Sequence, residues 1–159
     1  MIRLSWTDPY RLSAIIGSEN GDCWSALRRL ECFYPGFENW YHTQVMPGLR
    51  LGTREAFLSY RENFLAGVAI VKRDPSETKL CTLWVVPEFR GLGIGRTLAA
   101  SAFEWLGTNR PLFTVPEERI GEFDKLVSAW HFKRTQVIEG VYRSGKLEHV
   151  FNGRLIRPS

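Results

Sequence analysis

The chain is 159 residues long, and 44% of its residues are hydrophobic, 13% aromatic and 24% charged. This length suits one domain with one core, so residues 1–159 are expected to fold as a single domain. The composition excludes a disordered protein, and no apolar run approaches the ~20 residues that cross a bilayer. The net charge of +4 is compatible with an anionic ligand but too small for a dedicated nucleic-acid-binding protein.

The cysteines and histidines give no indication of a metal or disulfide site. The cysteines are odd in number and show no C-x-x-C spacing, which argues against a zinc site and a disulfide framework (Cys23, Cys32 and Cys81). The three histidines are scattered without the spacing of metal ligands. The segment Met1–Trp6 lacks the apolar run of a signal peptide. We therefore expect a cytoplasmic protein that uses no metal.

The first third of the chain is predicted to form one strand and two short helices. The strand covers about residues 2–6 and ends at Asp8-Pro9. Helical spacing of apolar residues predicts a helix over 23–32, and a second helix is expected over 37–46. Pro47-Gly48 is expected to end that second helix, because proline lacks an amide donor and glycine is a weak helix former.

The middle of the chain predicts a run of adjacent strands. Three apolar segments, over residues 55–60, 64–72 and 80–86, are separated by short polar turns. Two consecutive hairpins of this kind imply an antiparallel meander. The third strand leads directly into a glycine-rich loop.

The remainder alternates helices and strands. A helix with one apolar face is predicted to end at Gly107, followed by a strand over 111–115. Pro116-Glu117-Glu118 has the chemistry of a helix start, and two further strands are expected over 135–142 and 149–152. The element order β, α, α, β, β, β, α, β, α, β, β predicts an α/β fold. Its mixed, mostly antiparallel central sheet would be flanked by helices in a three-layer α/β/α arrangement.

The segment Arg90-Gly91-Leu92-Gly93-Ile94-Gly95-Arg96 carries the main functional signal. Glycine has no Cβ, so the backbone can turn sharply and approach a ligand closely. The first amides of the following helix lack internal acceptors, and the helix dipole adds partial positive charge. Together these features form a cradle for phosphate oxygens.

Two common nucleotide-binding motifs do not fit this segment. A dinucleotide-binding G-x-G-x-x-G loop would need a third glycine where the chain has Arg96, and no Walker A sequence is present. The loop also follows an antiparallel meander, whereas a Rossmann fold places it after the first strand of a βαβ unit.

The string Val85-x-Pro87-Glu88-Phe89-Arg90-Gly91-Leu92-Gly93-Ile94-Gly95 resembles the signature of the GNAT acetyltransferases. In that family the motif reads (Q/R)-x-x-G-x-(G/A), and Arg90, Gly93 and Gly95 occupy its three defining positions. The resemblance is specific over about residues 64–106 and rests on element order elsewhere. It implies a GNAT-like fold and acetyl-CoA as cosubstrate.

The resemblance also implies which residues bind the cosubstrate. The pantetheine arm would pair with main-chain groups of Leu83, Trp84 and Val85, as an added strand would. The N–H of Val85 would hold the developing oxyanion, and an amine would attack the thioester directly. The pyrophosphate would meet the glycine-rich loop and its arginines (Arg90, Gly91, Leu92, Gly93, Ile94, Gly95 and Arg96).

The sequence offers one candidate each for the general base and the general acid. Glu77, at the start of the strand, is the nearest candidate for a general base. The alternative interpretation is that Glu77 is a solvent-exposed turn residue without a catalytic role. The family often places a tyrosine acid where this chain has Val127. His131 is a local candidate for the acid, because histidine as a residue type can exchange a proton near neutral pH. Its alternative role is to cap the helix end, and it stands where the family usually has glycine.

An aromatic segment precedes the strands. In folds of this kind the first two helices usually line the acceptor pocket, so Trp40, Tyr41 and His42 are candidate substrate contacts. Packing of the same aromatics into the core is the alternative, and the sequence does not decide between the two.

The leading functional hypothesis is an acetyl-CoA-dependent N-acetyltransferase that acts on a primary amine. The acceptor could be a small molecule, a protein or an aminoacyl-tRNA, and homodimers are common in such folds. The alternative is a non-catalytic CoA-binding regulatory or interaction module, which the missing tyrosine and strand glutamate favour slightly.

Overall fold

The computed structural model describes residues 9–12 and 27–155. The strand expected over residues 2–6 and the first part of the helix expected over 23–32 lie outside these ranges. The helical elements are η3 (Arg28–Cys32), α2 (Phe37–Trp40), η4 (Tyr41–Val45), α3 (Met46–Leu51), η5 (Pro87–Phe89), α4 (Ile94–Leu106), η6 (Glu117–Arg119) and α5 (Ile120–Ala129). The strands are β1 (Tyr10–Arg11), β2 (Arg54–Arg61), β3 (Phe64–Asp74), β4 (Glu77–Val85), β5 (Leu112–Pro116), β6 (Arg134–Glu139) and β7 (Leu147–Phe151).

The strands form one mixed sheet in the order β1-β2-β3-β4-β5-β7-β6. The β4–β5 pair is parallel and the other neighbouring pairs are antiparallel. The predicted meander is therefore present as β2, β3 and β4, and the predicted mixed, mostly antiparallel sheet is confirmed.

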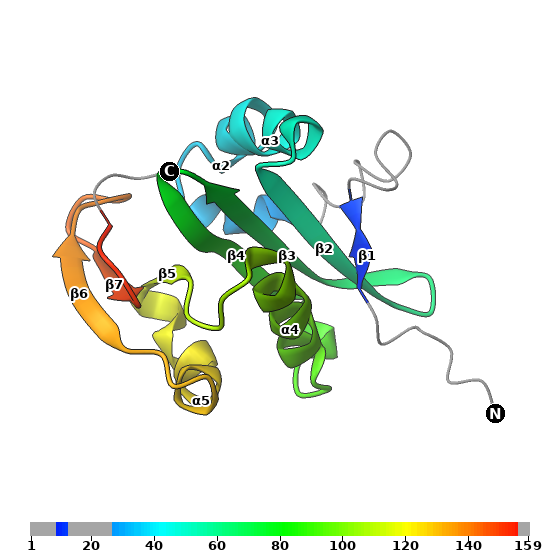
Figure 1. The fold of residues 1–159 in the computed structure, drawn as a ribbon. Helices are drawn as coiled ribbons and strands as arrows, with labels where there is room; N and C mark the ends of the chain where they lie inside the picture. Colours follow the sequence, from blue (N-terminus) through cyan, green and yellow to red (C-terminus); the bar gives the residue numbers. More distant parts are fainter. Residues whose placement is uncertain (1–8, 13–26, 156–159) are drawn as a thin grey trace.

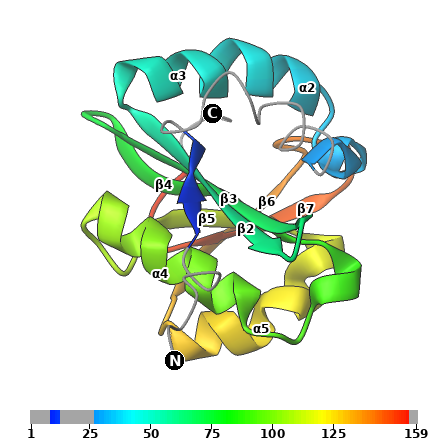
Figure 2. The ribbon, with the colours of Figure 1, turned by 90° about the vertical axis from the view of Figure 1, so that its right-hand side faces the viewer.

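Helices cover both faces of this sheet (Figures 1 and 2). Figure 2 shows α2 and α3 above the sheet, with α4 and α5 below it. Each face buries its own apolar cluster: one includes Leu98, Phe103 and Phe113 on the α4–α5 side, and the other includes Tyr41 and Val68 on the α2–α3 side. The predicted three-layer α/β/α arrangement is confirmed. Among the described residues, no helix is long and apolar enough to cross a membrane.

The prediction that Pro47-Gly48 ends the second helix is wrong. The chain stays helical from Phe37 to Leu51, because the π-helical segment η4 comes before the proline. Pro47 therefore follows a π-helical turn, in which the Met46 amide donates to the Tyr41 carbonyl five residues back, and this wider turn accommodates the proline. The helix ends instead at Gly52, whose φ of 77° is left-handed.

β4 and β5 pair only briefly, and this positions the site. Their recorded partners are Lys79 with Leu112 and Leu80 with Phe113. Beyond Leu80 the two strands are no longer paired, whereas β4 continues beside β3 as far as Val85. An opening therefore lies between the second half of β4 and β5.

Candidate active site

Main-chain groups of β4 line this opening. The Val86 amide donates to the Ala66 carbonyl at 2.8 Å, on the β3 side. Because hydrogen-bonding direction alternates along an antiparallel ladder, Leu83 and Val85 direct their N–H and C=O groups away from β3. The amides of these two residues therefore face the opening, where an extended ligand could pair with them as an added strand would.

A β-bulge in β4 turns a side chain toward the α2–α3 face. Val71 pairs with Leu80 and the adjacent Ile70 pairs with Thr82, so Cys81 is the extra residue. Bulges often occur next to active sites, because they redirect a side chain without ending the strand. Burial raises the pKa of the Cys81 thiol. The thiol is therefore protonated at neutral pH, which argues against a nucleophilic role.

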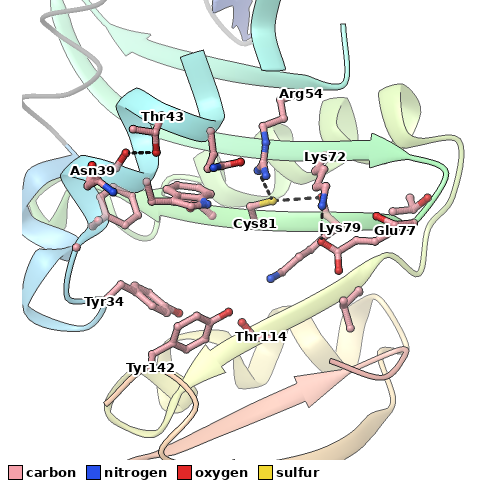
Figure 3. A pocket seen from close by; sticks show the side chains of 18 of the residues that line it. Tyr34, Asn39, Thr43, Arg54, Lys72, Glu77, Lys79, Cys81, Thr114 and Tyr142 are labelled. Atoms are coloured by element: carbon pink, nitrogen blue, oxygen red, sulfur yellow. Dashed lines mark hydrogen bonds and ion pairs between the residues drawn. The ribbon is translucent and has the colours of Figure 1, made fainter. Parts of the chain in front are cut away.

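The main pocket of the described chain has a volume of about 980 Å³ and lies on the α2–α3 face of the sheet. Figure 3 shows that its walls come from α2 and η4 on one side and from β4, β5 and the Tyr142 loop on the other. A second, much smaller void of about 10 Å³ lies between β4 and β5. Tyr34, Cys81, Thr82 and Thr114 line both the main pocket and this void, so the void lies directly behind the pocket wall where the two strands separate.

Glu148 is buried beside this point, and the sequence analysis did not identify it. It belongs to β7 and is 3% exposed, and the Tyr34 hydroxyl donates to its carboxylate at 3.1 Å. Burial raises the pKa of Glu148 to about 7, although its hydrogen bonds with Tyr34 and Thr114 act in the opposite direction. A carboxyl group with this pKa can accept a proton near neutral pH.

Other polar groups surround Glu148. Lys79, which is 2% exposed, and Thr114 both form side-chain hydrogen bonds with Tyr142. Burial alone lowers the pKa of Lys79, but Tyr142, Cys81 and Glu77 raise it, so this amine stays charged. Tyr142 lies in the loop between β6 and β7 and lines the main pocket, whereas the sequence placed it in a strand.

The glycine-rich loop has the backbone geometry that the sequence predicted. Gly91 and Gly93 have φ values of 82° and 81°, and Gly93 is the N-cap of α4. A Cβ at either position would meet nothing within 4 Å, so these glycines serve the left-handed backbone and not close packing. Gly95 is helical, and a Cβ there would make only ordinary contacts at 3.7 Å. Arg96 and Leu92 are exposed beside the loop.

Two arginines and a glutamate cross the outer end of the opening. Arg119 is 5% exposed, donates to the Leu83 carbonyl at 3.0 Å and pairs with Glu122 at 3.1 Å. Arg90 donates to the Val85 carbonyl at 3.2 Å and pairs with the same Glu122 at 3.3 Å. Both guanidinium groups lie about 5.1 Å from the Trp84 ring centroid.

The structure does not bring Glu77 and Val85 together. They stand at opposite ends of β4, and eight residues of strand span about 26 Å. Glu77 is paired with Lys72 at 3.1 Å and lines the main pocket. A thioester held at Val85 would therefore be far from this carboxylate.

His131 ends α5 in a left-handed conformation. Its φ is 57°, its amide donates to the Ser128 carbonyl at 3.1 Å, and the Phe132 amide donates to Val127 at 3.0 Å. This hydrogen-bond pattern is a Schellman motif, in which the left-handed residue is usually glycine. The exposed His131 side chain lines neither of the two cavities described above.

Of the three aromatic candidates for substrate contact, the structure places one at the pocket. Trp40 lines the main pocket, and its ring lies 5.5 Å from the Arg54 guanidinium carbon. Tyr41 is 1% exposed and packs in the core, so its ring does not reach the pocket. His42 is exposed and is not among the residues that line the pocket. Successive helical residues point in different directions, which separates these neighbours.

Glu148 has one local signal in the sequence. In the strand Leu147–Phe151, alternation places Glu148 on the same face as the fully buried Val150. An acid at an inward-facing position of a strand is unusual and indicates a partnered or functional group. Among the described residues, no group of three or more His, Cys, Asp or Glu side chains is arranged to hold a metal ion.

Comparison with known proteins identifies the family of this chain. The family model described as the acetyltransferase (GNAT) family matches residues 16–114. That match covers more than half of the chain, so the chain belongs to the GNAT acetyltransferase family. No curated protein sequence matches the chain.

Several solved acetyltransferases share the fold. The Campylobacter jejuni N-acetyltransferase PseH, in complex with acetyl coenzyme A, aligns with a TM-score of 0.57 and 17% identity over 91% of this chain and 96% of its own. The Escherichia coli ribosomal-protein-S18-alanine N-acetyltransferase aligns with a TM-score of 0.53 and 17% identity, over 62% of this chain and 67% of its own. A Bacillus subtilis acetyltransferase in complex with CoA aligns with a TM-score of 0.53 and 14% identity, over 72% of this chain and 86% of its own. In two further matches, to a nourseothricin acetyltransferase and a Bacillus anthracis acetyltransferase, this chain covers 64% and 62% of the other protein, less than two thirds of its length.

Proposed function

We propose that this protein is an N-acetyltransferase that moves an acetyl group from acetyl-CoA to a primary amine by direct attack. One observation carries the proposal: the edge of β4 that β5 leaves unpaired reaches the main pocket at Thr82, beside Tyr34 and Thr114. Two reactants that enter from opposite sides would come into contact there. Family membership supports the same reaction type.

The residues of the opening fit the cosubstrate. The amides of Leu83 and Val85 face the opening and can pair with the pantetheine arm, while the first amides of α4 can bind the pyrophosphate. Acetyl-CoA supplies an activated acyl group, so no covalent link to the protein is required. An outward-facing N–H of β4, that of Val85 or that of Leu83 next to Thr82, would donate to the thioester oxygen as negative charge develops on it.

Tyr34 and Glu148 can remove the proton from the attacking amine. Tyr34 lines both cavities, whereas Glu148 lies behind it, 3.1 Å from its hydroxyl. In this scheme the Tyr34 oxygen accepts a proton from the amine as its own proton moves to Glu148. The pKa of Glu148, at about 7, leaves a large fraction of this carboxyl group ionised at neutral pH.

The second candidate is a CoA-binding module without catalysis. The observation in its favour is that Arg119 and Arg90 already bond to the carbonyls of Leu83 and Val85 in the opening. A cosubstrate that pairs with those carbonyls must displace the guanidinium groups. The near-neutral carboxyl of Glu148 favours the enzyme, because a binding module has no need of a buried base.

Release of free CoA thiol tests the proposal. The protein is incubated with acetyl-CoA and a panel of primary amines, and thiol formation is followed with a chromogenic disulfide. We expect at least one amine to raise the rate above the background without amine, and Glu148→Gln to lower that rate. Binding of acetyl-CoA by calorimetry, with no amine-stimulated release, would instead support the binding module.

A further inference from the structure

The Arg54 side chain is a buried cation at the wall of the main pocket. It stands at the start of β2, is 6% exposed and lines the pocket opposite Lys79 (Figure 3). Its recorded contacts are a hydrogen bond to the Cys81 sulfur at 3.5 Å and the stacking on Trp40. In the part of the chain that the structure describes, no carboxylate forms an ion pair with it.

A buried guanidinium without a counter-ion is costly unless something compensates its charge. A thiol is a weak acceptor, and burial keeps Cys81 protonated, so it does not neutralise Arg54. Stacking on the Trp40 ring stabilises the guanidinium charge less than an ion pair with a carboxylate would. Most of the five N–H donors of this guanidinium are therefore available to a ligand in the pocket.

The backbone around Arg54 is shaped to hold it there. Gly48 lies inside α3, where glycine costs about 1 kcal/mol relative to alanine. A Cβ at Gly48 would lie 2.7 Å from both Cγ and Cδ of Arg54. The glycine therefore makes room for the arginine stem between α3 and the sheet. This close fit fixes the position of the guanidinium.

The rest of the pocket has the same sign of charge. Lys79 is buried and charged, and Arg154 also lines the pocket. Glu77 is the one carboxylate among the described lining residues, and Lys72 pairs with it at 3.1 Å. The pocket thus presents a net positive wall, while the proposed base lies behind Tyr34 at its inner end.

We propose that the acceptor is a small amine that also carries an anionic group, a carboxylate or a phosphate, and that Arg54 binds this group. Arg54 and Lys79 would hold the anion in the main pocket, and the amine would point toward Thr82 and Tyr34. This inference rests on the proposed N-acetyltransferase function. A planar guanidinium binds a carboxylate or a phosphate in a bidentate manner, so Arg54 determines both affinity and orientation.

Matched pairs of amines test this specificity. Each α-amino acid is compared with its methyl ester, and phosphoethanolamine with ethanolamine, by release of CoA thiol. The first pair tests a carboxylate and the second a phosphate. We expect the anionic member of one pair type to react with a kcat/KM at least tenfold above its neutral partner, which is about 1.4 kcal/mol.

Arg54→Met retains the stem and removes the charge, and Arg50→Met, at an exposed position on α3, is the matched control. Arg54→Met should raise the KM for the anionic acceptor at least tenfold, with the KM for acetyl-CoA unchanged, and should abolish the preference over the neutral partner. Arg50→Met should retain the wild-type preference. Neutral amines that react as well as their anionic partners in both pair types, or a preference that survives in Arg54→Met, would overturn the inference while the acetyltransferase function stands.

If no amine of either kind stimulates thiol release, the proposed function fails and a binding measurement tests Arg54 separately. Calorimetric titration in the presence of CoA uses N-acetylglycine and its methyl ester as probes. Binding of the acid alone, lost in Arg54→Met and kept in Arg50→Met, supports an anion site in the pocket. Equal binding of both probes, or binding of neither, counts against it.

Discussion

The Arg119 guanidinium donates to the Leu83 carbonyl at 3.0 Å across the opening between β4 and β5. This contact links η6 to β4 where the two strands no longer pair with each other. Under the proposed function the same carbonyl belongs to the strand edge that the pantetheine arm would use. Arg119 therefore connects the two sides of the opening and also occupies part of it.

We expect Arg119→Met to lower the free energy of unfolding by about 2 kcal/mol, because the Leu83 carbonyl loses a charged donor. In a domain of this size that loss corresponds to a fall in Tm of about 4–8 °C. Saturating acetyl-CoA should then raise the Tm of the variant more than that of the wild type, because the cosubstrate supplies the missing donor. Thermal unfolding with and without acetyl-CoA measures both effects, and equal shifts in the two proteins would contradict pairing at Leu83.

Glu148→Gln should lower kcat by about 10²–10⁴-fold, the usual contribution of a general base. The amide can still accept the Tyr34 hydrogen bond, so the KM for acetyl-CoA should change little. The wild-type rate should rise with pH through an apparent pKa near 7, and this limb should be absent in the variant. Steady-state kinetics from pH 5.5 to 9 give both results. A variant that keeps the limb near pH 7 would place the base elsewhere.

The same carboxyl group should make stability depend on pH. The folded pKa of Glu148 is raised from 4.5 to about 7, so the folded state binds more protons than the unfolded state between these values. Its contribution is therefore fully present below pH 4.5 and is lost as the pH rises through 7, by ~3 kcal/mol. Urea unfolding at pH 4.5 and pH 8 should show wild type losing about this much relative to Glu148→Gln. A pH-independent difference would show that the carboxyl is not perturbed.

Local patterns predicted the parts of the fold that depend on neighbouring residues. The helix α4 ends at the predicted Gly107, since apolar spacing and a left-handed C-cap are local features. The glycine-rich loop at the start of α4 was predicted for the same reason. Glu148 and Tyr34 were not identified, because 114 residues separate them and only the sheet order brings β7 beside β5. Pro47 was misread because a π-helical segment has no clear sequence signal.

Gly95→Glu should abolish acetyl-CoA binding without unfolding the protein. Gly95 is in the first turn of α4, where a Cβ makes ordinary contacts and an acidic side chain favours the helix dipole. The added negative charge would repel the pyrophosphate at the same helix end. Gly95→Ala is the size control, and calorimetry with a parallel unfolding curve is the measurement. Gly93 is less suitable, because its φ of 81° makes any side chain there strained. Unchanged acetyl-CoA affinity in a folded Gly95→Glu protein would exclude the phosphate cradle.

The variant His131→Gly tests whether His131 only ends helix α5 or also takes part in catalysis. Histidine at a φ of 57° carries a left-handed strain of about 1 kcal/mol that glycine does not, while glycine loses more entropy on folding. Because the Schellman hydrogen bonds to Ser128 and Val127 are made by backbone amides, the variant keeps them. We expect the free energy of unfolding to rise by ~0.5 kcal/mol, with an unchanged rate of acetyl transfer and an unchanged pH profile. His131→Ala, which retains the strain without the imidazole, should be no more stable than wild type. A tenfold loss of activity in both variants would instead assign His131 to the proton transfer, because the two share only the missing imidazole.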